Sequence, residues 1–406
     1  MEWIIIFFGV IAGIIAGAVA GVIPGVHPNL LASIAVAVSG LGFFQGERSI
    51  VVGFAVMVVA MSMVNGFVNF VPATYLGAPD DETVTSVLPA HKYMLQGRGH
   101  EAVLVTVISA LAGVVISCIS VPLLLVTLDE LEMVVKPTIP WVLGGVTIFL
   151  IGREKEARRI GYAIMVTLFA AVLGFFTLNE LGIKEPFLPM LSGLFGLPGL
   201  IRGVKSQGGI PKQVHSFPKL ERAGLTMAMT FVAGSLFSFL PGLGPSQAAV
   251  VCASMIKKKA EKMFLMINGG LNTVSMIIGF VTMYVIDKAR NGSVVAIGKL
   301  IGEIAMSELI LFMGVILCVV YPAVLITIII SKKCGEVLGK MNYKKVCYGV
   351  IGLIILLTGI LSGVKGLIVL GTATAIGMVT AIVDVQRNHL MSCIMVPTVA
   401  YYVFSV

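Results

Sequence analysis

Long apolar runs separated by short polar segments dominate the pattern along the chain. A membrane core about 30 Å thick needs about 20 apolar residues for each helix that crosses it. Runs near this length recur from one end of the sequence to the other. The pattern predicts membrane helices at 3–22, 50–72, 101–127, 137–151, 160–178, 223–240, 263–286, 306–330, 346–361, 367–383 and 390–405.

Three shorter apolar runs follow or contain glycine and proline, at 30–44, 187–201 and 247–256. Because glycine and proline interrupt the chain at these places, the short runs predict half-helices or re-entrant segments. Together with the long runs they predict an all-α polytopic membrane protein with about 11 to 14 membrane segments.

Composition and charge agree with a membrane location. Hydrophobic residues make up 58% of the chain and charged residues 12%, against about 25% charged in soluble domains. This excludes an ordinary soluble, disordered or nucleic-acid-binding protein. Cytoplasmic loops of membrane proteins collect Lys and Arg. We therefore expect a multi-pass protein of the cytoplasmic membrane whose cytoplasmic segments are 87–100, 152–159, 202–222, 257–262, 331–345 and 384–389.

Two short motifs occur twice, in the same order. PGxxP stands at 24–28 and 241–245, and NGxxNxV stands at 65–71 and 268–274. Each half thus has an apolar helix, a proline–glycine break, a short helix and a helix that carries two asparagines. This order predicts an internal duplication.

The loop charges predict that the two copies run in opposite directions. The second NGxxN helix follows the cationic segment 257–262, whereas the first one precedes the cationic segment 87–100. Oppositely directed copies form the inverted repeat found in many secondary transporters. The expected divisions are a first repeat at 1–130, linking helices at 131–222, a second repeat at 223–345 and C-terminal helices at 346–406.

The proline–glycine breaks are candidates for a substrate site. Proline interrupts the hydrogen bonds of a helix, and a helix broken near the middle of the membrane offers N–H groups to an anion and carbonyls to a cation. A kink that only aids packing is the alternative. The candidate substrate-binding residues are Pro24, Gly25, His27, Asn29, Pro241, Gly242, Gly244, Ser246 and Gln247.

His27 has a second possible role, because a histidine in a break can carry a transported proton. A structural hydrogen bond to an open carbonyl is the other interpretation. The polar segment that follows the first NGxxN helix adds Thr83 as a substrate candidate. The neighbouring Asp80, Asp81 and Glu82 can hold a cation or cap a helix.

The asparagines of the second motif are candidate cation ligands. Asn65 and Asn69 are four residues apart and share one helix face, and Asn268 and Asn272 repeat this spacing. Their amide oxygens can bind an alkali cation and their N–H groups a carboxylate. Hydrogen bonding between helices beside close glycine contacts is the alternative.

Enzyme chemistry has little support. The sequence contains no HExxH, no GxSxG with triad partners and no GxxxxGK[ST], and no loop is long enough for a nucleotide-binding domain. We expect no enzyme activity and no resident cofactor. Glu303 and Glu308 are interpreted as an amphipathic turn at the membrane surface.

Four segments carry a family resemblance: VIPGVHPN at 22–29, VPATYLGAP to VLPAHKYMLQGRGHEA at 71–102, FLPGLGPSQA at 239–248 and RNHLMSCIMVPTVAYY at 387–402. The chain resembles the TctA family, the large membrane subunit of tripartite tricarboxylate transporters, and its length is similar to that of short archaeal members. The resemblance implies a cation-coupled carboxylate importer with inverted repeats. It also implies a small membrane subunit and an extracytoplasmic binding protein as partners.

Two functions remain open at this stage. The first is a secondary transporter of a small organic anion, of the carboxylate class, coupled to Na⁺ or H⁺. The second is a translocase for a polyprenyl-phosphate-type lipid carrier. A lipid substrate needs a groove open to the bilayer, and a soluble anion needs a water-filled cavity. Contacts with membrane lipid and a homodimer are compatible with both, and a nucleic-acid partner with neither.

Overall fold

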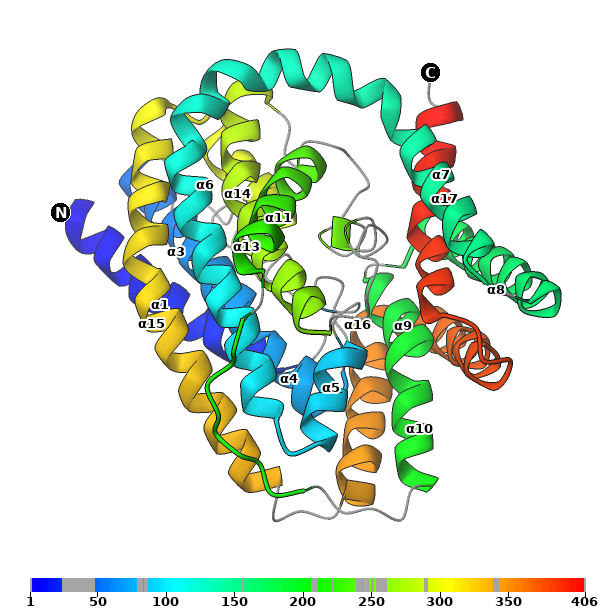
Figure 1. The fold of residues 1–406 in the computed structure, drawn as a ribbon. Coiled ribbons are helices and arrows are strands. Elements are labelled where there is room, and N and C mark those ends of the chain that lie inside the picture. The colour runs from blue at the N-terminus through cyan, green and yellow to red at the C-terminus, as the bar shows by residue number, and fades with distance from the viewer. Residues whose placement is uncertain are drawn as a thin grey trace.

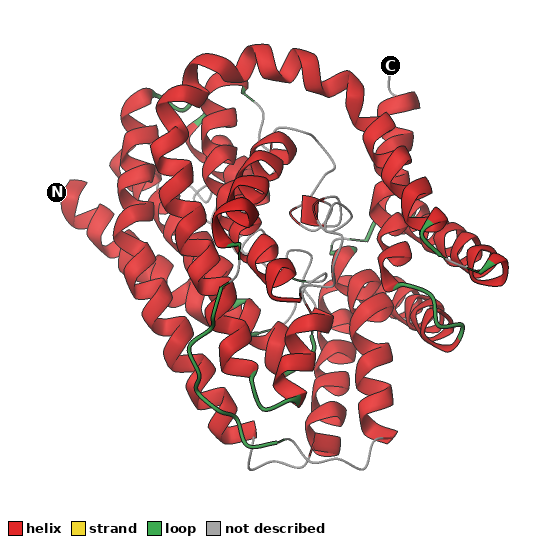
Figure 2. Cartoon of the chain, in the orientation of Figure 1, coloured by secondary structure: helices red, strands yellow, loops and turns green. Residues whose placement is uncertain are grey.

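The computed structural model describes residues 2–23, 48–78, 83, 87–154, 156–183, 185–205, 211–220, 222–238, 245, 248–249, 252, 261–287, 291–338 and 343–404. All regular elements in these residues are helices (Figure 2). Seven are long and apolar enough to cross a membrane, and four shorter apolar helices accompany them within the described chain. The predicted all-α polytopic fold is therefore confirmed.

The larger group of helices forms the left part of the molecule in Figure 1 and contains both NGxxN motifs. Its members are α1 (Glu2–Val22), α3 (Arg48–Val68), α4 (Phe70–Tyr75), α5 (Val87–Leu95), α6 (Gly99–Val135), α11 (Ala223–Ser238), α13 (Glu261–Ile286), α14 (Gly292–Ile301) and α15 (Met306–Leu338).

The second group lies on the right of the same view, and the far end of α6 arches over the top to reach it (Figure 1). Its α-helices are α7 (Ile139–Gly152), α8 (Ala157–Phe175), α9 (Phe187–Leu191), α10 (Leu197–Lys205), α16 (Tyr343–Ile382) and α17 (Ser392–Phe404). Short turns of 3₁₀ or π type adjoin them at Lys136–Thr138, Phe176–Glu180, Ser192–Gly196 and Arg387–Met391.

Two helix boundaries bear on the sequence predictions. The separate helices predicted at 346–361 and 367–383 agree with α16, whose backbone is non-helical at Gly363 (φ 66°). The helix predicted to end at residue 127 instead continues as α6 to Val135. Its extension, LDELEMVV, is rich in good helix formers, so the acidic residues do not end the helix.

The motif-bearing helices form the centre of the molecule. The most apolar stretch of α13 is 94% buried and that of α3 is 72% buried. The corresponding buried share is 28% for α1 and 33% for α16. The apolar side chains that α1 leaves exposed, such as Trp3 and Phe8, suit contact with lipid. The two helices with buried asparagines are thus the ones most shielded from the bilayer.

Helix α1 packs closely on α3 through glycines spaced four residues apart, at Gly9, Gly13, Gly17 and Gly21. A β-carbon added to Gly9 would lie 2.6 Å from the carbonyl oxygen of Gly53 on α3. Small residues at this spacing let membrane helices approach until their backbones touch. The stripe therefore fixes the position of α1 on α3.

Contacts at both ends give the relative direction of α3 and α15. Near the start of each helix, Arg48 Nη2 pairs with Glu308 Oε1 at 2.7 Å. At the other end, the hydroxyl of Tyr75 on α4 lies 3.3 Å from Ser331 Oγ on α15. Helices α3 and α15 therefore run in the same direction.

Equivalent contacts join α13 to α6. Lys262 Nζ, at the start of α13, lies 2.9 Å from Glu101 Oε1 at the start of α6. Further along, Thr273 Oγ1 donates a hydrogen bond to the carbonyl oxygen of Ala110 at 2.9 Å. These two helices also run in the same direction.

One contact gives the direction of the helix pair α3–α15 relative to the pair α13–α6. His100 Nδ1, at the start of α6, lies 2.9 Å from Ser331 Oγ near the end of α15. Helices α6 and α15 also pack against each other, so they run in opposite directions, and α3 and α13 therefore do too. Each motif-bearing helix lies against the long helix of the other half of the sequence.

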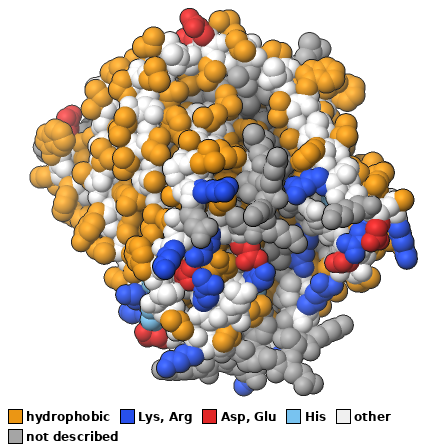
Figure 3. All heavy atoms as spheres, viewed as in Figure 1, with side chains coloured by type: hydrophobic (Ala, Val, Ile, Leu, Met, Phe, Trp, Pro, Cys, Tyr) orange, Lys and Arg blue, Asp and Glu red, His pale blue; other side chains and the backbone are white. Residues whose placement is uncertain are grey.

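Contacts also group the segments that carry most of the cations. Segment 92–101 meets the start of α13 and the stretch 211–220, and Arg202 donates to the carbonyl oxygen of Ala381. Arg159 pairs with Asp384 at 3.2 Å. Figure 3 shows Lys and Arg over the lower part of the molecule and hydrophobic side chains over the upper part. This agrees with the predicted assignment of these segments to one side of the membrane.

Candidate functional site

The two copies of the NGxxN motif meet inside the first group of helices. Asn272 Nδ2 on α13 donates a hydrogen bond to the carbonyl oxygen of Gly66 on α3 at 3.1 Å. A β-carbon at Gly66 would lie 3.3 Å from that nitrogen, so glycine permits this close approach. The contact joins the second motif directly to the first.

All four candidate asparagines are buried. Their exposed fractions are 1% for Asn65, 3% for Asn69, 0% for Asn268 and 5% for Asn272. Neither polar atom of the Asn65 amide has a hydrogen-bond partner among the described residues. A buried amide without a partner carries a desolvation cost, and such groups often mark functional sites.

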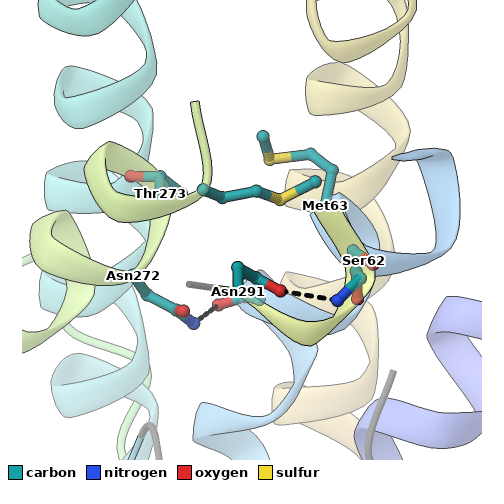
Figure 4. Close-up of a pocket in the computed structure, with 8 residues that line it drawn as sticks. Ser62, Met63, Asn272, Thr273 and Asn291 are labelled. Carbon is teal, nitrogen blue, oxygen red and sulfur yellow. Dashed lines mark hydrogen bonds between the residues drawn. The ribbon is translucent and has the colours of Figure 1, made fainter. Parts of the chain in front are cut away.

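A small cavity lies beside this contact, between α3, α13 and the beginning of α14 (Figure 4). It measures about 10 Å³, close to the least space that one water molecule needs. Two methionines, Met63 and Met276, line it together with polar groups from Ser62, Gly66, Asn272, Thr273, Asn291 and Ser293.

The polar atoms at the cavity differ in their hydrogen bonding. The Thr273 hydroxyl lies within hydrogen-bond distance of two carbonyl oxygens, that of Ala110 on α6 and that of Gly270 on α13. Ser62 is only 5% exposed, and its hydroxyl has no hydrogen-bond partner among the described residues. The cavity is therefore lined by a hydroxyl of α3 that has no hydrogen-bond partner among the described residues.

The first turn of α14 supplies another wall of the cavity. The Asn291 side chain caps this helix, because its Oδ1 accepts a hydrogen bond from the Ser293 N–H at 3.0 Å. Val294 lies beside Gly279, and Gly298 lies beside Met283, so α14 runs along α13 in the same direction.

This arrangement makes α14 a half-helix that begins inside the bundle. The cavity places its first turn near Met276, ten residues before the end of α13 at Ile286. Ten helical residues correspond to about 15 Å. The sequence prediction missed α14 because its apolar stretch is short. The Asn291–Gly292–Ser293 cap was the available signal.

The segment MLQGRGHE at 94–101 forms a polar junction at the other end of these helices. Gly97 adopts a left-handed conformation (φ 79°), and its carbonyl oxygen accepts from the N–H of Val214 at 2.7 Å. Gln213 accepts from the Gly99 N–H at 3.0 Å and donates to the Met94 carbonyl at 2.9 Å. The segment thus attaches the extended stretch 211–220 to the start of α6.

Glu101 is the centre of this junction and is 3% exposed. Arg98 donates two hydrogen bonds to its carboxylate, at 2.8 and 2.7 Å, and Ser216 donates a third at 3.1 Å. Lys262 adds an ion pair from α13. The carboxylate therefore joins three segments that are far apart in the sequence.

Glu308 occupies a similar place at the opposite end. It is 6% exposed, pairs with Arg48 and accepts a hydrogen bond from the N–H of Ala305 at 2.8 Å. The interpretation of this region as an amphipathic surface turn is therefore wrong for Glu308. A buried carboxylate needs a cationic partner, and that partner, Arg48, lies too far away in the sequence to be inferred from it.

The segment after the first motif is described only in part. Thr83 is fully buried, and Asp80, Asp81 and Glu82 lie outside the described residues. His91 Nδ1 lies 2.9 Å from the Thr74 carbonyl oxygen. Burial lowers the pKa of His91, while that hydrogen bond acts in the opposite sense. His91 thus packs against Thr74 and Gly77 at the start of this segment.

The remaining substrate candidates belong to the two PGxxP segments and the residues that follow them. Pro24, Gly25, His27 and Asn29 lie outside the described residues, as do Pro241, Gly242, Gly244, Ser246 and Gln247.

The sequence matches the family model described as "Tripartite tricarboxylate transporter TctA family" over residues 7–392, nearly its whole length. The chain belongs to the TctA family. It is also 26% identical over 358 residues to an uncharacterized protein of Methanocaldococcus jannaschii, which covers 85% of this chain and 87% of the relative. No solved structure matches the chain.

Family membership assigns the general role. TctA-family proteins are transporters rather than enzymes, and they work with partner proteins on a small-molecule substrate. With seven long apolar helices among its described residues, this TctA-family chain is a multi-pass membrane protein, and the cytoplasmic membrane is the usual location of the family.

Proposed function

We propose that this TctA-family protein is a secondary transporter that moves a small organic anion of the carboxylate class across the cytoplasmic membrane. Transport is coupled to Na⁺ or H⁺ and proceeds by alternating access to a site in the middle of the membrane. The PGxxP segments at 24–28 and 241–245 remain the proposed flanks of that site.

The observation that carries this proposal is the meeting of two oppositely directed helices with the same motif. Helices α3 and α13 touch through Gly66 and Asn272. Helix α1 packs on α3 in the first half, and α11 packs on α13 in the second half. Likewise, α15 packs on α3, and α6 packs on α13. This pattern supports repeats at 1–130 and 223–345, with 131–222 and 346–406 as additions. Inverted repeats that meet in the middle of the membrane are typical of secondary transporters.

The buried asparagines support a coupling cation. An anion that leaves water needs its charge and lost hydration offset. Amide oxygens of Asn65, Asn69, Asn268 and Asn272 are suitable ligands for a monovalent cation. The amide of Asn65 has no protein partner among the described residues, and Asn272 uses its nitrogen for Gly66. The Asn65 amide oxygen therefore has no hydrogen-bond partner among the described residues.

A soluble anion suits the described geometry better than a lipid carrier does. Helix α13, which carries the second motif, is 94% buried over its most apolar stretch. A lipid headgroup would need lateral access to the motif from the bilayer. From the family, we infer that the partners are a small membrane subunit and an extracytoplasmic binding protein.

Uptake of labelled anions tests this function. Membrane vesicles from cells that produce the chain, with any partner subunits, are given labelled citrate, succinate or acetate. A Na⁺ gradient, a pH gradient or no gradient is imposed. We expect accumulation of at least one anion above its external concentration when the coupling gradient is present. Uptake that is equal with and without gradients would contradict coupled transport.

A further inference from the structure

The cavity between α3, α13 and α14 has the properties of an anion site rather than a cation site. The N-terminus of a helix carries about half a positive charge and N–H groups without helical partners. Helix α14 has ten residues, and its capped first turn forms one wall of the cavity. None of the described side chains that line the cavity is charged.

A second observation, independent of the helix end, also indicates a ligand. The Ser62 hydroxyl comes from α3, is buried and has no hydrogen-bond partner among the described residues. A hydroxyl can donate to an anion at little cost when it has no other acceptor. Ser62 and the first turn of α14 therefore line the same small space from two sides.

We propose that a carboxylate group of the transported anion binds in this cavity, held by Ser62, Asn291 and the first turn of α14. The proposal rests on the proposed function and identifies where the negative charge of the substrate is recognised. It adds residues of α3 and α14 to the site, which the PGxxP breaks alone do not include.

The size of the cavity fits this assignment if its walls move. About 10 Å³ accepts one oxygen atom of a carboxylate. Met63 and Met276 form the apolar part of the lining, and methionine has three rotatable bonds that allow it to repack. Rotation of these side chains makes room for the rest of the group.

Replacing Asn291 by Asp provides a sharp test. Aspartate caps a helix as well as asparagine does, so α14 keeps its structure. The added negative charge would repel a carboxylate at the cavity. Binding of labelled citrate, succinate and acetate to the purified full-length protein is measured by equilibrium dialysis. We expect Asn291→Asp to weaken binding at least tenfold without lowering the melting temperature of the ligand-free protein.

Two further variants make the result specific. Thr138→Asp adds the same charge at the exposed N-cap of α7 and should leave binding unchanged. Ser62→Ala should weaken binding a few-fold, while the ligand-free protein becomes no less stable because an unpaired buried hydroxyl is removed. If Ser62 had only a structural role, Ser62→Ala would not weaken anion binding while leaving the ligand-free protein equally stable.

The outcomes separate this proposal from the proposed function. If the unsubstituted protein binds an anion and Asn291→Asp binds it equally well, the carboxylate lies elsewhere and only this proposal fails. If Asn291→Asp instead gains affinity for ²²Na⁺, the cavity is a cation site and the proposal is wrong. If the unsubstituted protein binds none of the three anions, the proposed function fails and this proposal fails with it.

Discussion

Single residues at the two ends of the central helices show how charge is accommodated in a protein with few charges. Glu101 and Glu308 are both buried, both lie in the first turn of a long helix, and both pair with a cation at the start of a motif-bearing helix. A buried carboxylate is costly without such partners. These pairs therefore join helices that belong to different halves of the sequence.

The junction at Glu101 predicts a measurable loss of stability. In Glu101→Gln, the carboxylate that accepts from Arg98, Ser216 and Lys262 is replaced by a neutral amide. Because Arg98 and Lys262 remain partly exposed and can turn to water, we expect a loss of about 1–3 kcal/mol rather than unfolding.

Thermal unfolding of the purified protein measures this loss. Glu261→Gln is the matched control, because it removes a more exposed ion pair, with Lys92, and should change stability by less than about 1 kcal/mol. Equal effects of the two substitutions would show that the Glu101 junction has no special role.

At the scale of helices, the sequence predicted most of the fold because apolar length is a strong signal for membrane helices. It correctly separated 346–361 from 367–383, where Gly363 interrupts α16. It missed α14, because a helix of ten residues that begins inside the bundle lacks the length of a spanning helix. Helix length is local information, whereas the position of α14 depends on packing against α3 and α13.

The glycine stripe of α1 predicts sensitivity to side-chain size. A β-carbon on Gly17 would lie 2.9 Å from the Val64 β-carbon, so Gly17→Leu should push α1 away from α3. Overpacking of this kind typically costs about 1–3 kcal/mol. Gly144→Leu on α7 should be tolerated, because nothing lies within 4 Å of a β-carbon there.

Melting temperatures of both variants in the same detergent test this expectation. The account predicts a clear decrease for Gly17→Leu and little change for Gly144→Leu. Similar melting temperatures for the two variants would contradict the close packing of α1 on α3.

At the scale of the whole molecule, the motifs and loop charges led to the expectation of oppositely directed halves, and the described contacts agree with the opposite directions of α3 and α13. The candidate site was less predictable. The asparagines were recognised because amides in apolar helices are unusual. Ser62 and Asn291 were not, because a serine in an apolar helix and an asparagine in a polar loop are both common. Only the fold brings them to one cavity.

Sided labelling of cysteines tests whether the two halves of the chain have opposite orientations in the membrane. The six native cysteines are replaced by serine, and single cysteines are introduced at Arg48, at the start of α3, and at Glu261, at the start of α13. An impermeant maleimide is then applied to intact cells and to inverted vesicles. The account predicts that position 48 is labelled only in intact cells and position 261 only in inverted vesicles. Labelling of both positions from the same side would contradict it.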